Sequence, residues 1–597
     1  MILSKAPFTH FSLLMSVCIV LFASSSLAQE GNSAPPARGP AGNAHPTETI
    51  RSGEITNPLD NLQRAATSST PVQKHSFSKQ VDLSPLGRLA VMHNSRPAVL
   101  DTLARDTVRR ITGRSKYQDF VRTTSGSDAT KLSYDPLFTF LDLIADKDYY
   151  FDKPIISVEY LPMRRGLVEA EFPGDGAEQE RWMMATRLSP RILFHQLDLV
   201  NGVYMADLTF QNGRSQMLLA FSHFRDLHAS LLLIAPRIEG GDWMHVSLDP
   251  NLSAQFARLG EAWRARDAKT VNAVVNEIAA VVPTINAEHY PPPWRSRLEI
   301  VYNGGNNFIF GYTFYFLALV ALLIAFGTGR LGLHRLGVAM LLLGLTVHVL
   351  GFAIRWLLAE RIPIQNQFES MWGLSLGSCL FATILMFARK QPIFGVAAAG
   401  VGFLALMAAT LKGIPGAEIG REAAILNTSY ILFYHVNIVL FSYGLISLGF
   451  IVSIVYLLVY YFAGRSAATV QLAAAGVGTV TMGGEADPGV NVGRQRLLSD
   501  LDHAQMVILQ LAFWILGVGI LLGAWWADHS WGRWWAFDPK ETWALITWIV
   551  YLIVIHVRFA APNRGLTTAW LSLVGFFIML WTYFGVNLLL PGLHAYA

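Results

Sequence analysis

The chain has 597 residues, of which 52% are hydrophobic and only 15% are charged, with a formal net charge of +4. This composition is typical of a membrane protein and argues against an ordinary soluble enzyme. No run of lysine and arginine is interleaved with aromatic residues, so we expect no nucleic-acid partner.

The first 28 residues have the layout of a secretory signal peptide. Lys5 precedes an apolar run from Phe11 to Ala23, and small residues end at Ala28, where we expect cleavage. The alternative is an uncleaved anchor helix, although the apolar run is short for a span of about 20 residues. In either case, we expect the segment that follows to be exported.

The next part of the chain divides into a linker and a domain. Residues 29–80 are rich in Ser, Thr, Pro, Asn and Gln, which predicts a flexible extracytoplasmic linker. Residues 81–300 have a globular pattern, with a helix predicted at 99–110 and strand-like alternation at 155–160. We therefore expect an exported mixed α+β domain, and its residues indicate no catalytic role.

The remainder, residues 301–597, predicts a polytopic α-helical membrane protein. It contains eight apolar stretches, each close to the length that crosses a bilayer, at 308–327, 336–358, 369–388, 393–411, 432–463, 505–527, 541–558 and 566–590. With the preceding domain outside, most basic loop residues fall inside, as the positive-inside rule requires. Four outer basic residues conflict with the rule: Arg361, Lys412, Arg421 and Arg533. The Gly- and Ala-rich segment 464–502 predicts a cytoplasmic linker.

Six tryptophans and a phenylalanine lie within residues 525–543, which we predict to be an outer loop. Several flat aromatic faces beside a membrane favour a flat aromatic ligand. The alternative is an interfacial aromatic belt, which would explain any single tryptophan here. The tryptophans that we assign to ligand binding are Trp526, Trp531, Trp534 and Trp535.

The end of the same segment also predicts a helix start. Asp538 as N-cap, Pro539 at the first helical position and Glu541 three residues after the cap form a capping box. Asp538 therefore has a structural interpretation as well as a ligand-binding one. Arg533 and Lys540 are better candidates for pairing with an anionic group such as a propionate.

Five histidines are candidates for metal or haem ligation. His435, His529 and His594 fall on the predicted outer face, and two neutral imidazoles would saturate a haem iron. A capping or interfacial role is the alternative for each. His348 and His556 lie within predicted spans, where a polar side chain is expensive and a functional role is the default, with hydrogen bonding to a neighbouring helix as the alternative.

Thiol chemistry would require a partner. The chain has two cysteines, Cys18 in the predicted signal peptide and Cys379 in a predicted span.

Four motifs together resemble the CcsA/ResC family of cytochrome c biogenesis proteins, which carry a Trp-rich WWD motif. They are residues 531–542, 556–558 and 585–597, and Asn366-Gln367-Phe368-Glu369-Ser370, in which Phe368 replaces the family's tyrosine. This resemblance covers about residues 300–597. Residues 100–105 and 111–117 look like the exported region of large CcsA-type proteins that are fused or adjacent to ResB-like partners, and this match is less specific.

The resemblance implies a site for haem b. His435 and His594 would be its outer axial ligands and the catalytic pair, the tryptophans would cradle the porphyrin, and His556 would ligate haem within the membrane. The family's second membrane histidine would come from a separate ResB-like subunit, or His348 would substitute for it.

The activity implied is that of a cytochrome c synthase, or haem lyase, which attaches haem to apocytochrome c. Its partners would be apocytochrome c, a ResB-like membrane subunit and a thiol-reducing thioredoxin-like protein. The location implied is the bacterial cytoplasmic (inner) membrane, with the N-terminal domain and the C-terminus on the periplasmic side. The rival functions are a haem exporter or delivery module without ligation activity, and a cytochrome b-like electron-transfer subunit.

Overall fold

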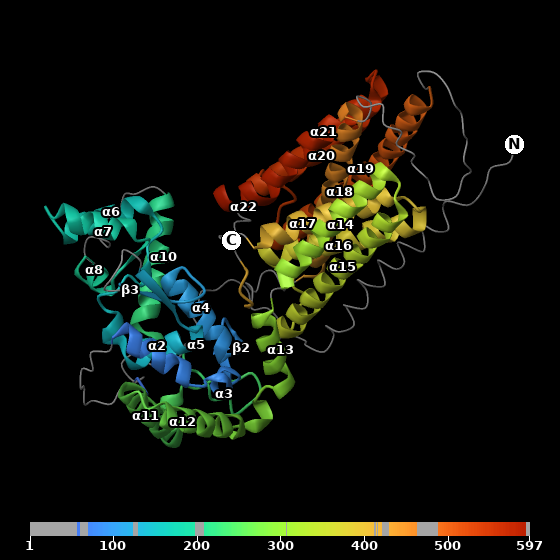
Figure 1. Ribbon diagram of the computed structural model, residues 1–597. Helices are drawn as coiled ribbons and strands as arrows, with labels where there is room; N and C mark the ends of the chain where they lie inside the picture. The colour runs from blue at the N-terminus through green and yellow to red at the C-terminus, as the bar shows by residue number, and fades with distance from the viewer. Residues whose placement is uncertain are drawn as a thin grey trace. The chain divides into compact units, whose positions relative to one another are not determined.

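The computed structural model describes residues 57–59, 70–122, 129–196, 208–305, 307–410, 414, 416–420, 429–462, 488–590 and 592. The predicted signal peptide lies outside these residues. Residues 70–305 form an N-terminal domain, and the described residues from 307 onward form a bundle of long helices (Figure 1).

The N-terminal domain is mixed α+β, as predicted. Its strands pair in three separate antiparallel two-stranded sheets, β1 with β2, β3 with β4 and β5 with β6. The strands are β1 (Ala90–His93), β2 (Arg96–Val99), β3 (Gln118–Arg122), β4 (Ala129–Ser133), β5 (Ile156–Ser157) and β6 (Arg187–Leu188). The α-helices are α2 (Pro71–Gln80), α3 (Ser84–Gly87), α4 (Leu100–Thr112), α5 (Pro136–Ala145), α6 (Leu161–Glu171), α7 (Gly176–Met184), α8 (Pro190–His195), α10 (Leu208–Arg225), α11 (Pro250–Ala265), α12 (Ala268–Val281) and α13 (Pro293–Gly304). Short 3₁₀ helices are η1 (Lys147–Tyr150), η2 (Leu227–Ser230), η3 (Val246–Leu248), η4 (Val282–Thr284) and η5 (Ala287–His289).

Helix α2 shows that the predicted flexible linker is wrong over residues 71–80. Thr70 caps this helix, and Phe77 is buried in the domain core. Lys74 is also buried, with its Nζ 2.7 Å from a carboxylate oxygen of Asp142 and of Asp146. Phe77 and the ion pairs of Lys74 therefore hold residues 71–80 in the domain, although the composition of this segment is typical of a linker.

The bundle contains eight helices that are long and apolar enough to cross a membrane, among the residues described. This number agrees with the prediction, and the chain is a multi-pass membrane protein. The helices are α14 (Asn307–Thr328), α15 (Leu331–Ala359), α16 (Gln367–Arg389), α17 (Pro392–Ala409), α18 (Tyr430–Phe462), α19 (Pro488–Trp531), α20 (Pro539–Ala560) and α21 (Arg564–Leu580). A π-helical turn, η7 (Trp581–Gly585), and a short helix, α22 (Val586–Leu589), continue α21.

The predicted cytoplasmic linker 464–502 is wrong at its C-terminal part, because α19 already begins at Pro488. The Asp502 carboxylate pairs with the Arg558 guanidinium of α20, so this part of α19 has a tertiary partner.

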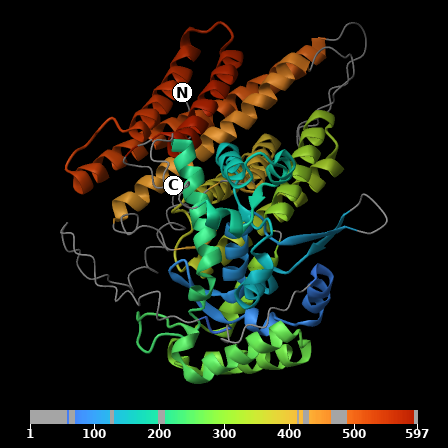
Figure 2. The same ribbon diagram turned by 90° about the vertical axis from the view of Figure 1, so that its left-hand side faces the viewer.

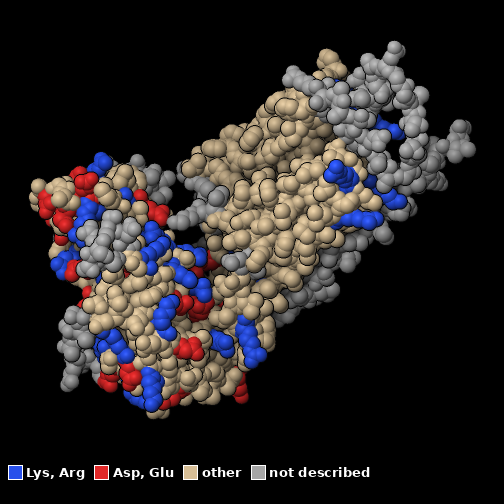
Figure 3. All heavy atoms as spheres, viewed as in Figure 1, with Lys and Arg blue, Asp and Glu red and all other residues tan. Residues whose placement is uncertain are grey.

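Successive helices of the bundle alternate in direction, because most connections between them are short. The starts of α14, α16, α18 and α20 therefore lie at the end of the bundle where the N-terminal domain joins the first helix. We call this the domain-side end. Helices α20 and α21 lie side by side in both views (Figure 1, Figure 2). The visible sides of the bundle carry almost no charged side chains, whereas charges of both signs are interspersed over the N-terminal domain (Figure 3).

A fully buried carboxylate organises the domain-side end. Glu369, in the first turn of α16, accepts from the Arg355 Nη2 at 2.8 Å and from the Arg361 Nη1 at 2.7 Å. Asn366 caps the same helix by accepting from the Glu369 N–H at 2.8 Å. Arg361, which conflicted with the positive-inside rule, is thus neutralised by a partner within the bundle.

Arg355 also holds the loop that follows α17. Its guanidinium donates to the carbonyl oxygens of Gly416 at 2.9 Å, Ala417 at 2.9 Å and Glu418 at 3.2 Å. Five donors in one planar group allow arginine to satisfy several carbonyls of a buried loop at once. Residues 416–420 are therefore fixed by the α16 ion-pair cluster.

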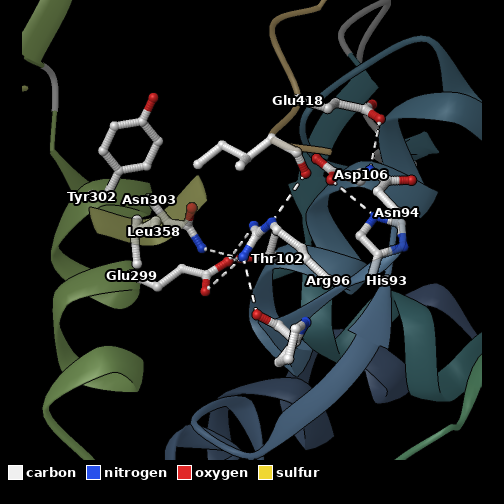
Figure 4. Close-up of polar contacts among 12 residues, drawn as sticks. His93, Asn94, Arg96, Thr102, Asp106, Glu299, Tyr302, Asn303, Leu358 and Glu418 are labelled. Carbon is white, nitrogen blue, oxygen red and sulfur yellow. Dashed lines mark hydrogen bonds and ion pairs between the residues drawn. The ribbon is translucent and has the colours of Figure 1, made fainter. Parts of the chain in front are cut away.

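The same loop contacts the N-terminal domain (Figure 4). The Arg96 Nε donates to the Ile419 carbonyl at 3.0 Å, and Arg96 also pairs with Glu299 of α13 at 2.7 Å. The Glu418 carboxylate pairs with Arg110 of α4. Burial tends to raise the pKa of Glu418, but the hydrogen bond and charge of Arg110 outweigh burial and hold that pKa below its ordinary value. The Glu418 carboxylate therefore stays charged at neutral pH.

Replacing Glu369 by Gln removes the charge that compensates the buried guanidinium of Arg355 and the half-buried guanidinium of Arg361. We expect Glu369→Gln to lower the free energy of unfolding by about 3–5 kcal/mol, measured as a lower denaturation temperature of the full-length protein in detergent. Glu277→Gln is the matched control, because Glu277 is exposed and pairs with an exposed Arg258, where a pair contributes about 0–1 kcal/mol. Wild-type stability of Glu369→Gln would show that the cluster does not depend on this charge.

Candidate functional site

The tryptophan-rich segment is less of a loop than the sequence predicted. Helix α19 continues through Trp531, and Gly532, in the left-handed conformation at φ +69°, ends it. Only residues 532–538 are non-helical before α20 begins. Trp525, Trp526 and Trp531 therefore lie on the last turns of α19, Trp534 and Trp535 in the turn, and Trp543 on α20.

The aromatic side chains of this segment differ in exposure. Trp534 and Phe537 are 56% and 78% exposed. Trp526 is buried and meets Trp531 edge to face at 4.9 Å between ring centroids. The Trp526 Nε1–H has no hydrogen-bond partner among the residues that the structure describes. A buried donor without an acceptor is uncommon and requires an explanation.

Phe537 has a backbone conformation that bulky residues rarely adopt. Its φ is +56°, in the left-handed region, where a Cβ is crowded and glycine is preferred. Such strain persists only where the surroundings enforce it and is found most often at functional sites.

The capping box predicted at Asp538 is present. The Asp538 Oδ2 accepts from the Lys540 N–H at 3.2 Å, and the Glu541 Oε2 accepts from the Ala536 and Asp538 N–H groups at 2.8 and 3.4 Å. Both carboxylates therefore shape the turn. Arg533 is exposed in this turn, and Lys540 is half-buried in the first turn of α20, at the helix end where a cation is least favourable.

His435 lies within the second turn of α18, inside the span predicted at 432–463. Its Nδ1 is 2.7 Å from the carbonyl oxygen of Gly519 on α19. A carbonyl oxygen only accepts, so Nδ1 carries the proton and Nε2 has the lone pair. Histidines that bind metals use this arrangement, with the second ring nitrogen held by a carbonyl or carboxylate.

The structure brings His435 against α19, the helix whose last turns begin the tryptophan-rich segment. Its ring lies against Gly523, where an added β-carbon would be 2.5 Å from His435 Cε1. Trp526 is three residues beyond Gly523 on the same helix, about one helical turn away. The sequence analysis missed both Gly519 and Gly523, although their Gly-x-x-x-Gly spacing is a known signal for close helix packing in membranes.

His594 lies outside the described residues, but Gly592 is described. A β-carbon on Gly592 would lie 2.6 Å from Asp538 Oδ1 and 3.2 Å from Pro539 Cδ. The chain near its C-terminus therefore packs against the end of the tryptophan-rich turn.

The other three candidate histidines make contacts that differ from those of His435. His529 is exposed on the last turns of α19 and bonds through Nδ1 to the Trp525 carbonyl at 3.0 Å. His556 is exposed on α20 and bonds through Nδ1 to the Leu552 carbonyl at 2.8 Å. It lies 17 residues after Pro539, about 25 Å along the helix at 1.5 Å per residue.

His348 has the hydrogen bonds of a buried structural histidine. Its Nε2 is 3.3 Å from the Trp372 carbonyl, and its Nδ1 is 3.2 Å from the Tyr315 hydroxyl. Nε2–H therefore donates to the carbonyl, and the tyrosine donates to Nδ1. The structure thus agrees with the alternative of hydrogen bonding to neighbouring helices.

Replacing Asp538 separates its capping role from its charge. Asn caps helices as well as Asp does, whereas Ala costs about 0.5–2 kcal/mol. We expect Asp538→Asn to keep the denaturation temperature of the full-length protein and Asp538→Ala to lower it. Asp249, the N-cap of α11, is the matched control and should give the same pair of results. Equal destabilisation by Asn and Ala at 538 would contradict a capping role.

Comparison with known proteins agrees with these features. The family model described as "Cytochrome C assembly protein" matches residues 310–594. Proteins named "Cytochrome c biogenesis protein CcsA" are similar to this chain over about half of its length. That of Pyropia yezoensis is 30% identical over 319 residues, covering 50% of this chain and 98% of the relative. Those of Gloeobacter violaceus and Prochlorococcus marinus strain NATL2A are 32% and 31% identical, covering 46% and 49% of this chain and 88% and 96% of the relatives. Through its helical bundle, this chain belongs to the CcsA family of cytochrome c assembly proteins.

Proposed function

We propose that the chain is a component of a cytochrome c synthase. It moves haem to the extracytoplasmic face of the membrane and holds the haem there during attachment to apocytochrome c. The observation that carries the proposal is the state of His435. Its Nδ1–H is held by the Gly519 carbonyl, so the Nε2 lone pair is the metal-binding one, and it lies beside the tryptophan-rich segment. Membership of the CcsA family supports the same reaction.

His435 and His594 are the proposed axial ligands of the iron. Gly592 packs against Asp538, and His594 is two residues further along the sequence. Two imidazoles fill both axial positions and protect the iron from oxygen chemistry. One of them yields when the histidine of the substrate Cys-x-x-Cys-His segment binds.

The tryptophan-rich segment is the proposed cradle for haem b, the substrate. Trp526, Trp531, Trp534 and Trp535 supply flat polarisable faces. The Trp526 Nε1–H, which has no partner among the described residues, is a donor that a ligand acceptor would satisfy. Arg533 and Lys540 are the proposed partners of the propionates. Asp538 sets the shape of the turn through its cap, so it supports the cradle whether or not it contacts haem.

His556 is the proposed ligand for haem during its passage through the membrane. His556 is exposed on a helix that is apolar enough to cross a membrane, where a histidine is expensive unless a partner or ligand covers it. The second membrane ligand is proposed to come from a ResB-like subunit rather than from His348, because ligation by His348 would break its bond to Tyr315 or to Trp372.

The reaction adds each of two apocytochrome thiols across a haem vinyl group. The sulfur bonds to one vinyl carbon and the proton goes to the other, so no oxidant or reductant is consumed. The enzyme contributes positioning and control of the iron ligands. Cys379 is buried in α16 and its thiol donates to the Ala398 carbonyl, so the thiols come from the substrate, and a thioredoxin-like partner is proposed to keep them reduced.

The proposal is tested by absorption spectra of the full-length protein, co-expressed with apocytochrome c and a ResB-like partner. We expect His435→Ala and His594→Ala each to lose most of the haem absorbance and of the covalent cytochrome. His503→Ala is the matched control, because His503 is exposed at the opposite end of α19. Normal haem and cytochrome in both variants would remove the histidine pair from the mechanism. Normal haem without covalent cytochrome, even in the wild-type system, would indicate a haem delivery module.

A further inference from the structure

The domain-side parts of α18 and α19 approach each other across two glycines. Gly519 and Gly523 are one helical turn apart on α19 and both face α18. A β-carbon on Gly519 would lie 2.7 Å from Val439 Cγ2, and one on Gly523 would lie 2.5 Å from His435 Cε1. Any residue other than glycine would therefore force the two helices or their side chains apart. Small residues at four-residue spacing serve close helix approach in membranes.

The two glycines act on the same imidazole in different ways. The Gly519 carbonyl accepts the Nδ1–H bond at 2.7 Å. Gly523 leaves room for the ring, because its added β-carbon would lie 2.8 Å from Nδ1 and 3.1 Å from Nε2 as well as 2.5 Å from Cε1. Three ring atoms thus occupy the place that a side chain at position 523 would take.

Resting on the proposed function, we infer that Gly523 is a positioning residue for the haem ligand His435. Its bare α-carbon lets the ring lie against α19, where Nδ1 reaches the Gly519 carbonyl and the lone pair is fixed on Nε2. A side chain at 523 moves the ring away from this carbonyl, so both the direction and the tautomer of the ligand are lost. Groups that hold metal-binding histidines in this way typically contribute about 10- to 100-fold to metal affinity.

Simple helix packing is the competing explanation, and the chain contains a control for it. Gly449 lies between the same two helices, where an added β-carbon would be 2.8 Å from Leu509 Cδ2. It is 14 residues after His435, about 21 Å along α18. Gly449→Ala therefore disturbs the packing of α18 against α19 without touching the imidazole.

The experiment compares Gly523→Ala, Gly449→Ala and His435→Ala in the full-length protein, co-expressed with apocytochrome c and its partner subunit. Haem absorbance per protein and covalent cytochrome are measured with and without added imidazole. We expect Gly523→Ala and His435→Ala to lose about 10- to 100-fold in haem retention and to be restored by imidazole, which replaces the misplaced ligand. Gly449→Ala should behave as the wild type.

A double variant keeps the test decisive if Gly523→Ala accumulates poorly. In His435→Ala/Gly523→Ala no ring is present for the new β-carbon to displace, so the double variant with imidazole should match His435→Ala with imidazole. A further loss in the double variant, no restoration of Gly523→Ala, or an equal loss in Gly449→Ala would overturn the inference. Wild-type haem retention in Gly523→Ala, together with loss of haem in His435→Ala, would also overturn the inference. The proposed function would then still stand. Wild-type haem in His435→Ala would instead refute the proposed function.

Discussion

The domain-side end of this protein depends on the Glu369 carboxylate. It has no exposure to solvent and compensates the charges of both Arg355 and Arg361. Arg355 in turn holds the loop carbonyls at 416–418. Removing one charge from such a buried cluster costs more than any single hydrogen bond supplies. Helices α15 and α16 and the loop that follows α17 therefore form a single electrostatic unit.

This unit reaches the N-terminal domain through residues 416–420. Arg96 contacts the Ile419 carbonyl, and Arg110, from a different element of that domain, contacts the Glu418 carboxylate. The domain therefore contacts the loop between α17 and α18, and α18 is the helix that carries His435.

The candidate site itself is built from helix ends and close helix contacts. The last turns of α19 carry three tryptophans, the capping box of α20 closes the turn, and the glycines of α19 seat the imidazole of α18. Each of these devices is rigid, because it lies on or caps a long helix. Such rigidity suits the proposed function, which requires orientation of a large flat substrate more than a nucleophile.

Periodicity and residue type alone predicted much of this protein. Eight apolar stretches gave eight helices because the bilayer requires each span to satisfy its own backbone, and the Asp538 capping box follows from a local pattern within four residues. The tryptophans and His435 were also proposed as site residues from the sequence, because six tryptophans lie within residues 525–543 and a neutral imidazole can ligate a haem iron. By contrast, helix α2 depends on contacts with the core of the folded domain, which the polar composition of its sequence does not reveal.

Only the tertiary structure decided how these residues act. The sequence placed His435 near a helix start, but the bond to Gly519 that fixes its tautomer joins residues 84 positions apart. It offered two interpretations for His348, and the contacts with Tyr315 and Trp372, from two other helices, satisfy both ring nitrogens. The sequence also showed Glu369 only as part of the motif at 366–370. The two arginine partners of Glu369 come from α15 and from the connection that follows α15. Local pattern determines where helices begin, end and cross the membrane, whereas hydrogen bonds and ion pairs between helices depend on which faces pack together.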